Sequence, residues 1–326
     1  MDTASPQCPR CGYDLSGLAA SWRESCPMTG TCSECGHSYH WGDLFFPLRH
    51  APAWSFEHSP KPAAALAASW WRALRPRSFW SRLQMHHTIV APRLWIALAI
   101  VLLLLHLATG VGMVWLEHTA GVIAAQTGSD WLRVRDPWSV FINPYARVVA
   151  NQFPGVYAAW VYVAVLTALF CPGAFVMLRQ TFTRLGLRRD HVLRAAGYSL
   201  APLPLLLLVF SLARAIGAYG SAWALGLTLR TTRSGPPDGL TRFCSALDDA
   251  AGRIGAYQWL SMPLTLAWCG SFWWFFARRY LKLADATRAT TLLVLVSFLA
   301  ALAVVTFWPG STLARDLGTT LMGMQE

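Results

Sequence analysis

Charged residues are scarce in this chain of 326 residues. They make up 13% of it, about half of the roughly 25% that is typical of soluble domains. Apolar residues make up 55%, and lysine is nearly absent, since only Lys61 and Lys282 stand among the 27 basic residues. This composition argues against a chain built only of soluble domains and favours a membrane protein. The 17 tryptophans favour it too, because amphipathic rings are enriched at membrane interfaces.

The first 90 residues also lack an apolar run of the length found in secretory leader peptides. The first long run starts near Leu94, so we expect no leader, and we expect the N-terminal segment to stay in the cytosol. Five of the eight cysteines lie within the first 35 residues. In a reducing compartment, paired C-x-x-C sequences favour a metal over disulfides.

Familiar catalytic signatures are missing as well. The chain has no H-E-x-x-H, no G-x-S-x-G and no phosphate loop, and no carboxylate lies within its long apolar runs, which argues against an ion-coupled carrier. We therefore expect a non-enzymatic protein. One alternative stays open, a membrane enzyme or carrier with a polar site at the outer face. Its candidates are Glu117 and His118, and also His106, an ionisable residue inside an apolar run.

Long apolar runs dominate the chain after residue 93. Each is near the roughly 20 residues that span a bilayer, and a bilayer core requires such segments to be helical. Pro172 in FCPGAF is expected to break the second run, and LAPLPL, residues 200–205, is expected to kink the third. Together the runs predict an all-α bundle of five transmembrane helices, at about 94–116, 156–178, 195–213, 257–277 and 291–308.

Arginine in the connecting segments predicts the orientation of this bundle. Residues 179–194 hold five arginines and residues 278–290 hold four basic residues. The positive-inside rule then places the N-terminus in the cytosol and the C-terminus outside, in a multi-pass protein of the cell (plasma or inner) membrane. The apolar stretch 215–229 is an open alternative, because a sixth span there would place the C-terminus in the cytosol.

Four cysteines form two knuckles near the N-terminus. The sequence is CPRCG around Cys8 and Cys11, then CSECG around Cys32 and Cys35, with 20 residues between the pairs. This spacing is typical of a four-cysteine zinc site, and four sulfur ligands leave no open position for catalysis. We expect one structural Zn²⁺ held by these four residues. Substitute ligands are Cys26, His37 and His40.

The knuckles resemble the zinc-ribbon family, in particular ribbons at the N-terminus of bacterial multi-pass membrane proteins. The resemblance covers residues 6–45 and implies a small zinc-bound module. The membrane part is similar in topology to the Yip1-like family, with a cytosolic N-terminus, five spans and GYSLAP at residues 197–202. The predicted fold is thus an all-α polytopic helical bundle with a small N-terminal zinc ribbon at residues 1–50.

Residues 51–93 separate the ribbon from the bundle, residues 94–326. Their first part, 51–62, holds three prolines and is typical of a linker. In the second part, 63–83, Leu66, Trp70 and Leu74 share one helical face beside four arginines. This pattern predicts a basic helix in the headgroup plane of the membrane, with Pro76 kinking or ending it.

The net charges of residues 1–50 and 51–93 indicate which partners each segment can bind. Residues 1–50 hold three arginines against five acidic residues, a net charge of −2, whereas a nucleic-acid surface needs positive charge. Nucleic acid is therefore not expected as a partner. Residues 51–93 carry a net charge of +5, with six basic residues against Glu57, which favours an anionic lipid bilayer. A cytosolic protein partner of the ribbon remains a further candidate.

Overall fold

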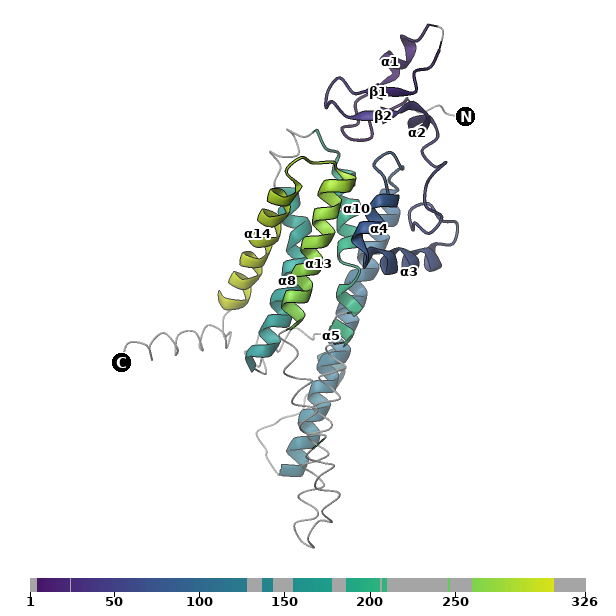
Figure 1. Ribbon diagram of the computed structural model, residues 1–326. Coiled ribbons are helices and arrows are strands. Elements are labelled where there is room, and N and C mark those ends of the chain that lie inside the picture. The colour runs from purple at the N-terminus through teal and green to yellow at the C-terminus, as the bar shows by residue number, and fades with distance from the viewer. Residues whose placement is uncertain are drawn as a thin grey trace, which may run out of the picture. The chain divides into compact units, whose positions relative to one another are not determined.

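A computed structural model describes residues 5–23, 25–127, 137–142, 155–177, 186–205, 207–209, 246 and 260–307 (Figure 1). These parts of the chain are mostly helical, with one small two-stranded sheet. The chain divides into two compact units. The first comprises Met1–Ile100, Ala168–Pro202 and Leu266–Ser297, and the second comprises Val101–Thr167, Leu203–Thr265 and Phe298–Glu326.

The sheet lies in the N-terminal part of the first unit. Strands β1 (Thr29–Thr31) and β2 (Ser38–His40) pair antiparallel, with Gly30 opposite Tyr39. A Cβ atom at Gly30 would lie 2.8 Å from the Tyr39 ring, so only glycine lets this ring cover the strand. Two short helices, α1 (Ser16–Ala20) and α2 (Trp41–Phe45), flank the sheet (Figure 1).

The predicted interfacial helix is divided in two. Helix α3 (Pro62–Ala73) and helix α4 (Pro76–Arg82) each begin with a proline in the first turn, where the missing amide costs no hydrogen bond. Leu66, expected to face lipid, is only 8% exposed and packs with Phe56. Trp71, beside the predicted face, is 64% exposed. The protein itself therefore occupies part of the face that the sequence assigned to lipid.

Among the residues that the structure describes, three helices are long and apolar enough to cross a membrane. They span Ala91–Trp115, Arg189–Val209 and Ala286–Phe307 and coincide with three of the five predicted spans. They belong to α5 (Ala91–Thr127), to the segment that begins with α10 (Arg189–Ser199), and to α14 (Ala286–Phe307).

The other two predicted spans fall on α8 (Gly155–Met177) and α13 (Ser261–Phe275). Within α8, the segment Tyr162–Met177 is apolar but shorter than the three candidate spans. A count of five spans therefore stays a prediction. The stretch 215–229 lies outside the described residues.

The prolines act differently from one another. Helix α10 ends at Ser199, and a turn at Leu200–Pro202 precedes the next helical residues, so the expected kink is confirmed. The expected break at Pro172 is wrong, because α8 continues through it. The helix is packed against protein at this point, since Ala168 and Cys171 are buried, and this burial offsets part of the cost of the proline.

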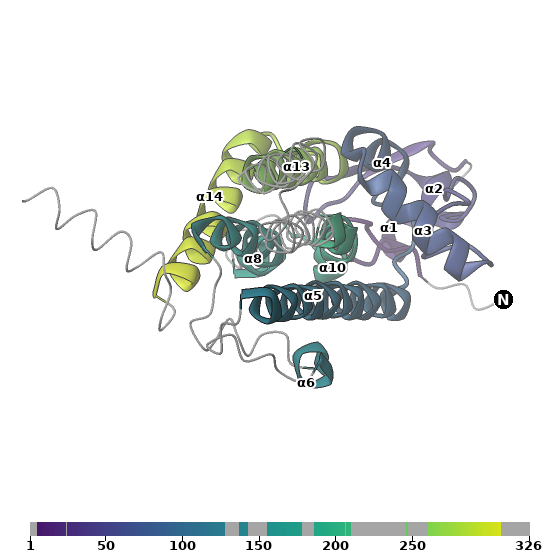
Figure 2. The ribbon, with the colours of Figure 1, turned by 90° about the horizontal axis from the view of Figure 1, so that it is seen from below.

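An aromatic cluster joins α4 to the end of α13. Helix α13 continues as a π-helical turn, η2 (Phe276–Tyr280), and α4 packs against it (Figure 2). Trp80 of α4 is 1% exposed, and its ring centroid lies 4.9 Å from that of Phe276 and 5.0 Å from that of Tyr280. Burying rings of this size gives several kcal/mol at about 25 cal/mol per Å².

A buried ion pair ties the N-terminal segment to α10. The Glu57 carboxylate accepts two hydrogen bonds of 2.8 Å from Arg194, one from Nε and one from Nη2, and both side chains are 0% exposed. Arg194 also donates to the Thr88 carbonyl at 2.7 Å, and the Tyr198 hydroxyl donates to Glu57 at 3.3 Å. The helix that carries the third predicted span begins before residue 195, because α10 starts at Arg189. Arg194 therefore lies inside the helix, where Glu57 balances its charge.

The second unit contains the later part of α5 and the short helix α6 (Pro137–Ile142). The two approach closely, since a Cβ atom at Gly110 of α5 would lie 3.0 Å from the Phe141 carbonyl oxygen. The glycine therefore permits a contact that a larger residue would prevent.

Replacing Glu57 by glutamine should lower stability strongly. The change leaves the buried Arg194 charge uncompensated, which costs about 3–5 kcal/mol. Asp190→Asn is the matched control, because Asp190 pairs with Arg188 at 3.0 Å on the surface, where such a pair contributes about 1 kcal/mol or less. Thermal unfolding of the purified full chain measures both, and equal melting temperatures for the two variants would contradict this assignment.

Candidate metal centre

The two knuckles have the same backbone geometry. In the first, the Gly12 amide donates to the Cys8 carbonyl at 2.9 Å, and in the second the Gly36 amide donates to the Cys32 carbonyl at 3.0 Å. Both glycines have positive φ, +80° and +65°. Glycine adopts this conformation without the steric cost that a Cβ atom adds, so each C-x-x-C-G sequence closes a tight turn with both sulfurs on one side.

The four sulfur atoms converge. Cys8 Sγ lies 3.6 Å from Cys35 Sγ, and Cys11 Sγ lies 3.6 Å from Cys32 Sγ, while all four atoms lie within 4.8 Å of one another. A tetrahedral ion with bonds of about 2.3 Å requires neighbouring sulfurs about 3.8 Å apart. The cluster therefore has the size and the donor set of a four-thiolate metal site.

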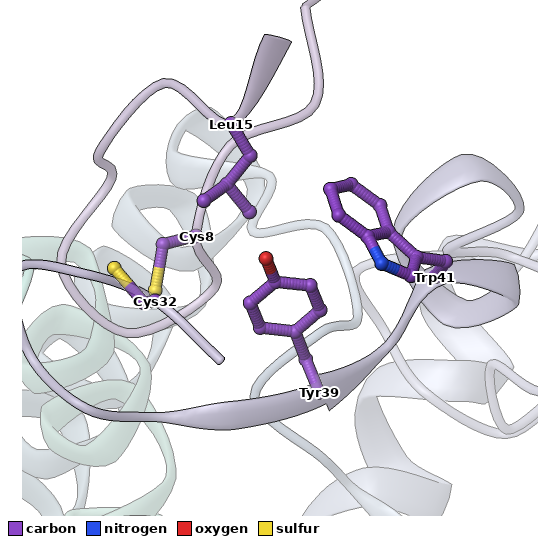
Figure 3. Close-up of a cluster of buried hydrophobic side chains, with 5 residues drawn as sticks. All are labelled: Cys8, Leu15, Cys32, Tyr39 and Trp41. Atoms are coloured by element: carbon purple, nitrogen blue, oxygen red, sulfur yellow. The ribbon is translucent and has the colours of Figure 1, made fainter. Parts of the chain in front are cut away.

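A small apolar core covers one side of this cluster. Figure 3 shows Cys8 and Cys32 with their sulfurs close together, next to Leu15 and the ring of Tyr39. These side chains and Trp41 form one buried group, and the Tyr39 and Trp41 rings meet edge to face at 5.1 Å. Since so few side chains make this core, we expect metal binding to contribute much of the ribbon's folding free energy.

Burial acts on the thiols. It raises the pKa of Cys8 well above its usual range and raises that of Cys35 to about 11, because a thiolate is poorly solvated there. At Cys32 burial opposes ionisation, but hydrogen bonds from the backbone of Cys35 and Glu34 help to bring the pKa below its usual value. A metal bound here would therefore have to displace protons from Cys8 and Cys35.

The three substitute ligands lie outside the cluster. The cluster consists of Cys8, Cys11, Cys32 and Cys35. Cys26 is exposed, with its thiol near the Pro27 carbonyl. Burial lowers the pKa of His37 to about 4, with smaller contributions from Lys282 and Arg10, so His37 is neutral at pH 7.

The ribbon packs against the start of α10. The Arg188 amide donates to the Arg10 carbonyl at 3.0 Å. Gly186 has a φ of +57°, and a Cβ atom there would lie 3.3 Å from Cys11 Cβ and 3.4 Å from Cys35 Cβ. The chain before α10 thus lies directly on the ligand loops, and a glycine permits this approach.

A histidine completes this contact. His191 is 1% exposed, its Nε2 atom donates to the Pro9 carbonyl at 2.7 Å, and its Nδ1 atom lies 2.8 Å from the Tyr280 hydroxyl. Tyr280 also accepts a hydrogen bond of 2.9 Å from Arg194. The first knuckle, α10 and η2 are therefore joined by one buried hydrogen-bond network that includes Glu57.

Sequence reasoning missed this network. Glu57 stood in an expected linker, and Arg194 stood in an expected loop whose arginines served only to orient the bundle. The available signal was the spacing of His191, Arg194 and Tyr198. Steps of three and four place these polar residues on one helical face, next to a segment predicted to be apolar.

In the described part of the chain, the residues of the alternative outer site do not belong to a group of side chains that could bind a metal. His106 lies half-buried in α5, and His118 is exposed further along the same helix. The side chain of Glu117 lies outside what the structure describes.

Comparison with known proteins adds no family, since no family model, no curated protein and no solved structure matches this chain.

Cys8→Ser should abolish metal binding and unfold the ribbon, because three thiolates cannot close the tetrahedral site. Cys26→Ser should leave the metal content unchanged, since Cys26 is exposed and outside the cluster. Elemental analysis of the purified full chain measures one metal per chain in the wild type and in Cys26→Ser. Equal metal content in Cys8→Ser and the wild type would overturn the ligand assignment.

Proposed function

We propose that this chain is a multi-pass integral membrane protein whose N-terminal ribbon binds one structural Zn²⁺ and caps the cytosolic ends of the membrane helices. The role is organisational rather than enzymatic. The observation that carries the proposal is the four-cysteine cluster and its packing against residues 186–191.

Zinc is the metal that fits these ligands. Four thiolates in a tetrahedron select zinc or iron, and zinc is the common structural ion in paired C-x-x-C knuckles. All four corners are filled by protein sulfur. The ion would therefore hold the two knuckles together, and the protein supplies no position for a bound water that could react.

The docked position of the ribbon favours a cap over a free recognition module. One surface of the knuckles lies against Gly186, Arg188 and His191 of the same chain. A cytosolic protein that used this surface would first have to displace these contacts. A separate protein partner would therefore bind elsewhere on the ribbon, and its identity does not enter the proposal.

The membrane arrangement proposed here follows the sequence. Five spans, a cytosolic N-terminus and an outer C-terminus agree with the basic residues that flank the candidate spans. Arg278 lies over the Trp274 ring at 5.0 Å from its centroid, and Arg279 lies over the Phe275 ring at 5.8 Å. Aromatic rings and arginines paired in this way are typical of a helix end at the headgroup level, and an anionic lipid bilayer is the partner proposed for them and for Trp71.

The cap can be tested at Gly186. Gly186→Ala should weaken docking, because alanine is strained at a φ of +57° and its Cβ atom would press on Cys11 and Cys35. The strain costs about 1–2 kcal/mol. Limited proteolysis of the full chain with trypsin should then cleave faster at Arg49, which is exposed between α2 and the buried segment that contains Glu57. Gly17→Ala is the matched control, since a Cβ atom there meets nothing within 4 Å, and equal cleavage rates for the two variants would argue for a free ribbon.

The proposed orientation has its own test. A reporter fused after Glu326 should give an outside signal, and one fused after Arg189 should give an inside signal, because the basic segments 179–194 and 278–290 are retained in the cytosol. Paired alkaline phosphatase and fluorescent protein fusions measure both sides. An inside signal at the C-terminus would mean an even number of spans, as a sixth helix at 215–229 would produce.

A further inference from the structure

A continuous path of hydrogen bonds leads from the candidate metal centre into the helices. Pro9, between Cys8 and Cys11, offers its carbonyl to His191, which contacts the Tyr280 hydroxyl. From Tyr280 the path continues through Arg194 to the carboxylate of Glu57. Every step is between 2.7 and 2.9 Å long, and each of these side chains is at most 2% exposed.

The chemistry of the groups fixes the protons along this path. A carbonyl oxygen can only accept a hydrogen bond. His191 Nε2 therefore carries the ring proton and donates a hydrogen bond to the Pro9 carbonyl. Nδ1 of a neutral His191 then accepts from the Tyr280 hydroxyl, whose oxygen accepts from Arg194. Each donor has one acceptor in this assignment. If the Pro9 carbonyl moved away, a buried N–H group would lose its partner, which is costly in a dry site.

The position of the Pro9 carbonyl depends on the metal. Cys8 and Cys11 hold two corners of the tetrahedron, and the turn between them contains only Pro9 and Arg10. Both of these residues use their carbonyls to bind α10, one through His191 and one through the Arg188 amide. A ribbon of this size does not keep such a turn by its apolar core alone, so losing the ion loosens both contacts at once.

We propose that the membrane helices respond to metal occupancy of the ribbon through this path, so that the protein reports the availability of Zn²⁺ to its bundle. This inference rests on the proposed function and adds a regulatory role. With metal bound, Pro9 and Arg10 hold the start of α10, and His191 holds η2 through Tyr280. Without it, the ribbon leaves and the cytosolic ends of α10 and η2 become accessible to water.

Linkage makes this proposal quantitative. If metal favours docking, docking must favour metal by the same factor. A variant that cuts the path without touching a cysteine should therefore bind zinc more weakly. Tyr280→Phe is such a variant, because it keeps the ring that packs on Trp80 and Phe276 and removes only the hydroxyl.

The full chain, purified in detergent and titrated with Zn²⁺ against a chromophoric chelator, gives the affinity. Tyr280→Phe removes two hydrogen bonds, of which the one to His191 leads to Pro9 and the one to Arg194 lies within the helices. It should therefore bind about fivefold more weakly than the wild type, the change expected for losing the one bond that depends on docking. Tyr198→Phe is the matched control. It also removes a hydroxyl that bonds to Glu57, but it lies off the path to Pro9, so its affinity should stay within about twofold of the wild type.

Hydrogen exchange of the wild-type chain tests the same coupling without a substitution. Stripping the zinc should raise exchange at residues 186–199 and 276–283, whereas residues 291–307 of α14 should not change. Unchanged exchange at the first two segments, together with equal affinities for both tyrosine variants, would overturn the coupling while leaving a zinc-binding ribbon in place. A wild-type chain that binds no zinc would instead overturn the proposed function itself.

Discussion

The structure of the first unit depends on the pairing of Glu57 with Arg194. Two charges out of contact with water are costly unless each is fully bonded, and here the carboxylate and the guanidinium meet through two parallel hydrogen bonds of 2.8 Å. Because Arg194 also binds the carbonyl of Thr88 and the hydroxyl of Tyr280, the pair has one well-bonded arrangement. The segment that contains Glu57 is therefore held in place by this ion pair and its hydrogen bonds, in addition to apolar burial.

The ribbon is joined to this arrangement at several points. Its first knuckle uses two backbone carbonyls, at Pro9 and Arg10, and its ligand loops lie on Gly186. Every residue has the same backbone carbonyl. A contact made by carbonyls therefore depends on the shape of the turn and not on the identity of its side chains. The cysteines help to determine that shape, so the proposed metal site and the start of α10 share the same few backbone atoms.

The sequence predicted the parts of this protein that follow local rules. The C-x-x-C-G spacing gave all four members of the cysteine cluster, apolar length gave three helices that could cross a membrane, and Pro76 gave the boundary between α3 and α4. The failures had non-local causes. Glu57 and Arg194 lie 137 residues apart, and no periodicity connects them. Pro172 was expected to break α8, but its neighbours in space support the helix.

The same separation has a consequence for biogenesis. Glu57 leaves the ribosome 137 residues before Arg194, and at about 5–20 residues per second the wait lasts about 7–27 s. During this time the carboxylate stays hydrated and the ribbon has no α10 to lie against. Tyr280 follows 86 residues after Arg194, so the network closes only after η2 has been synthesised. An unfinished chain therefore differs from a finished one in leaving Glu57 and the contact surface of the cysteine knuckles uncovered.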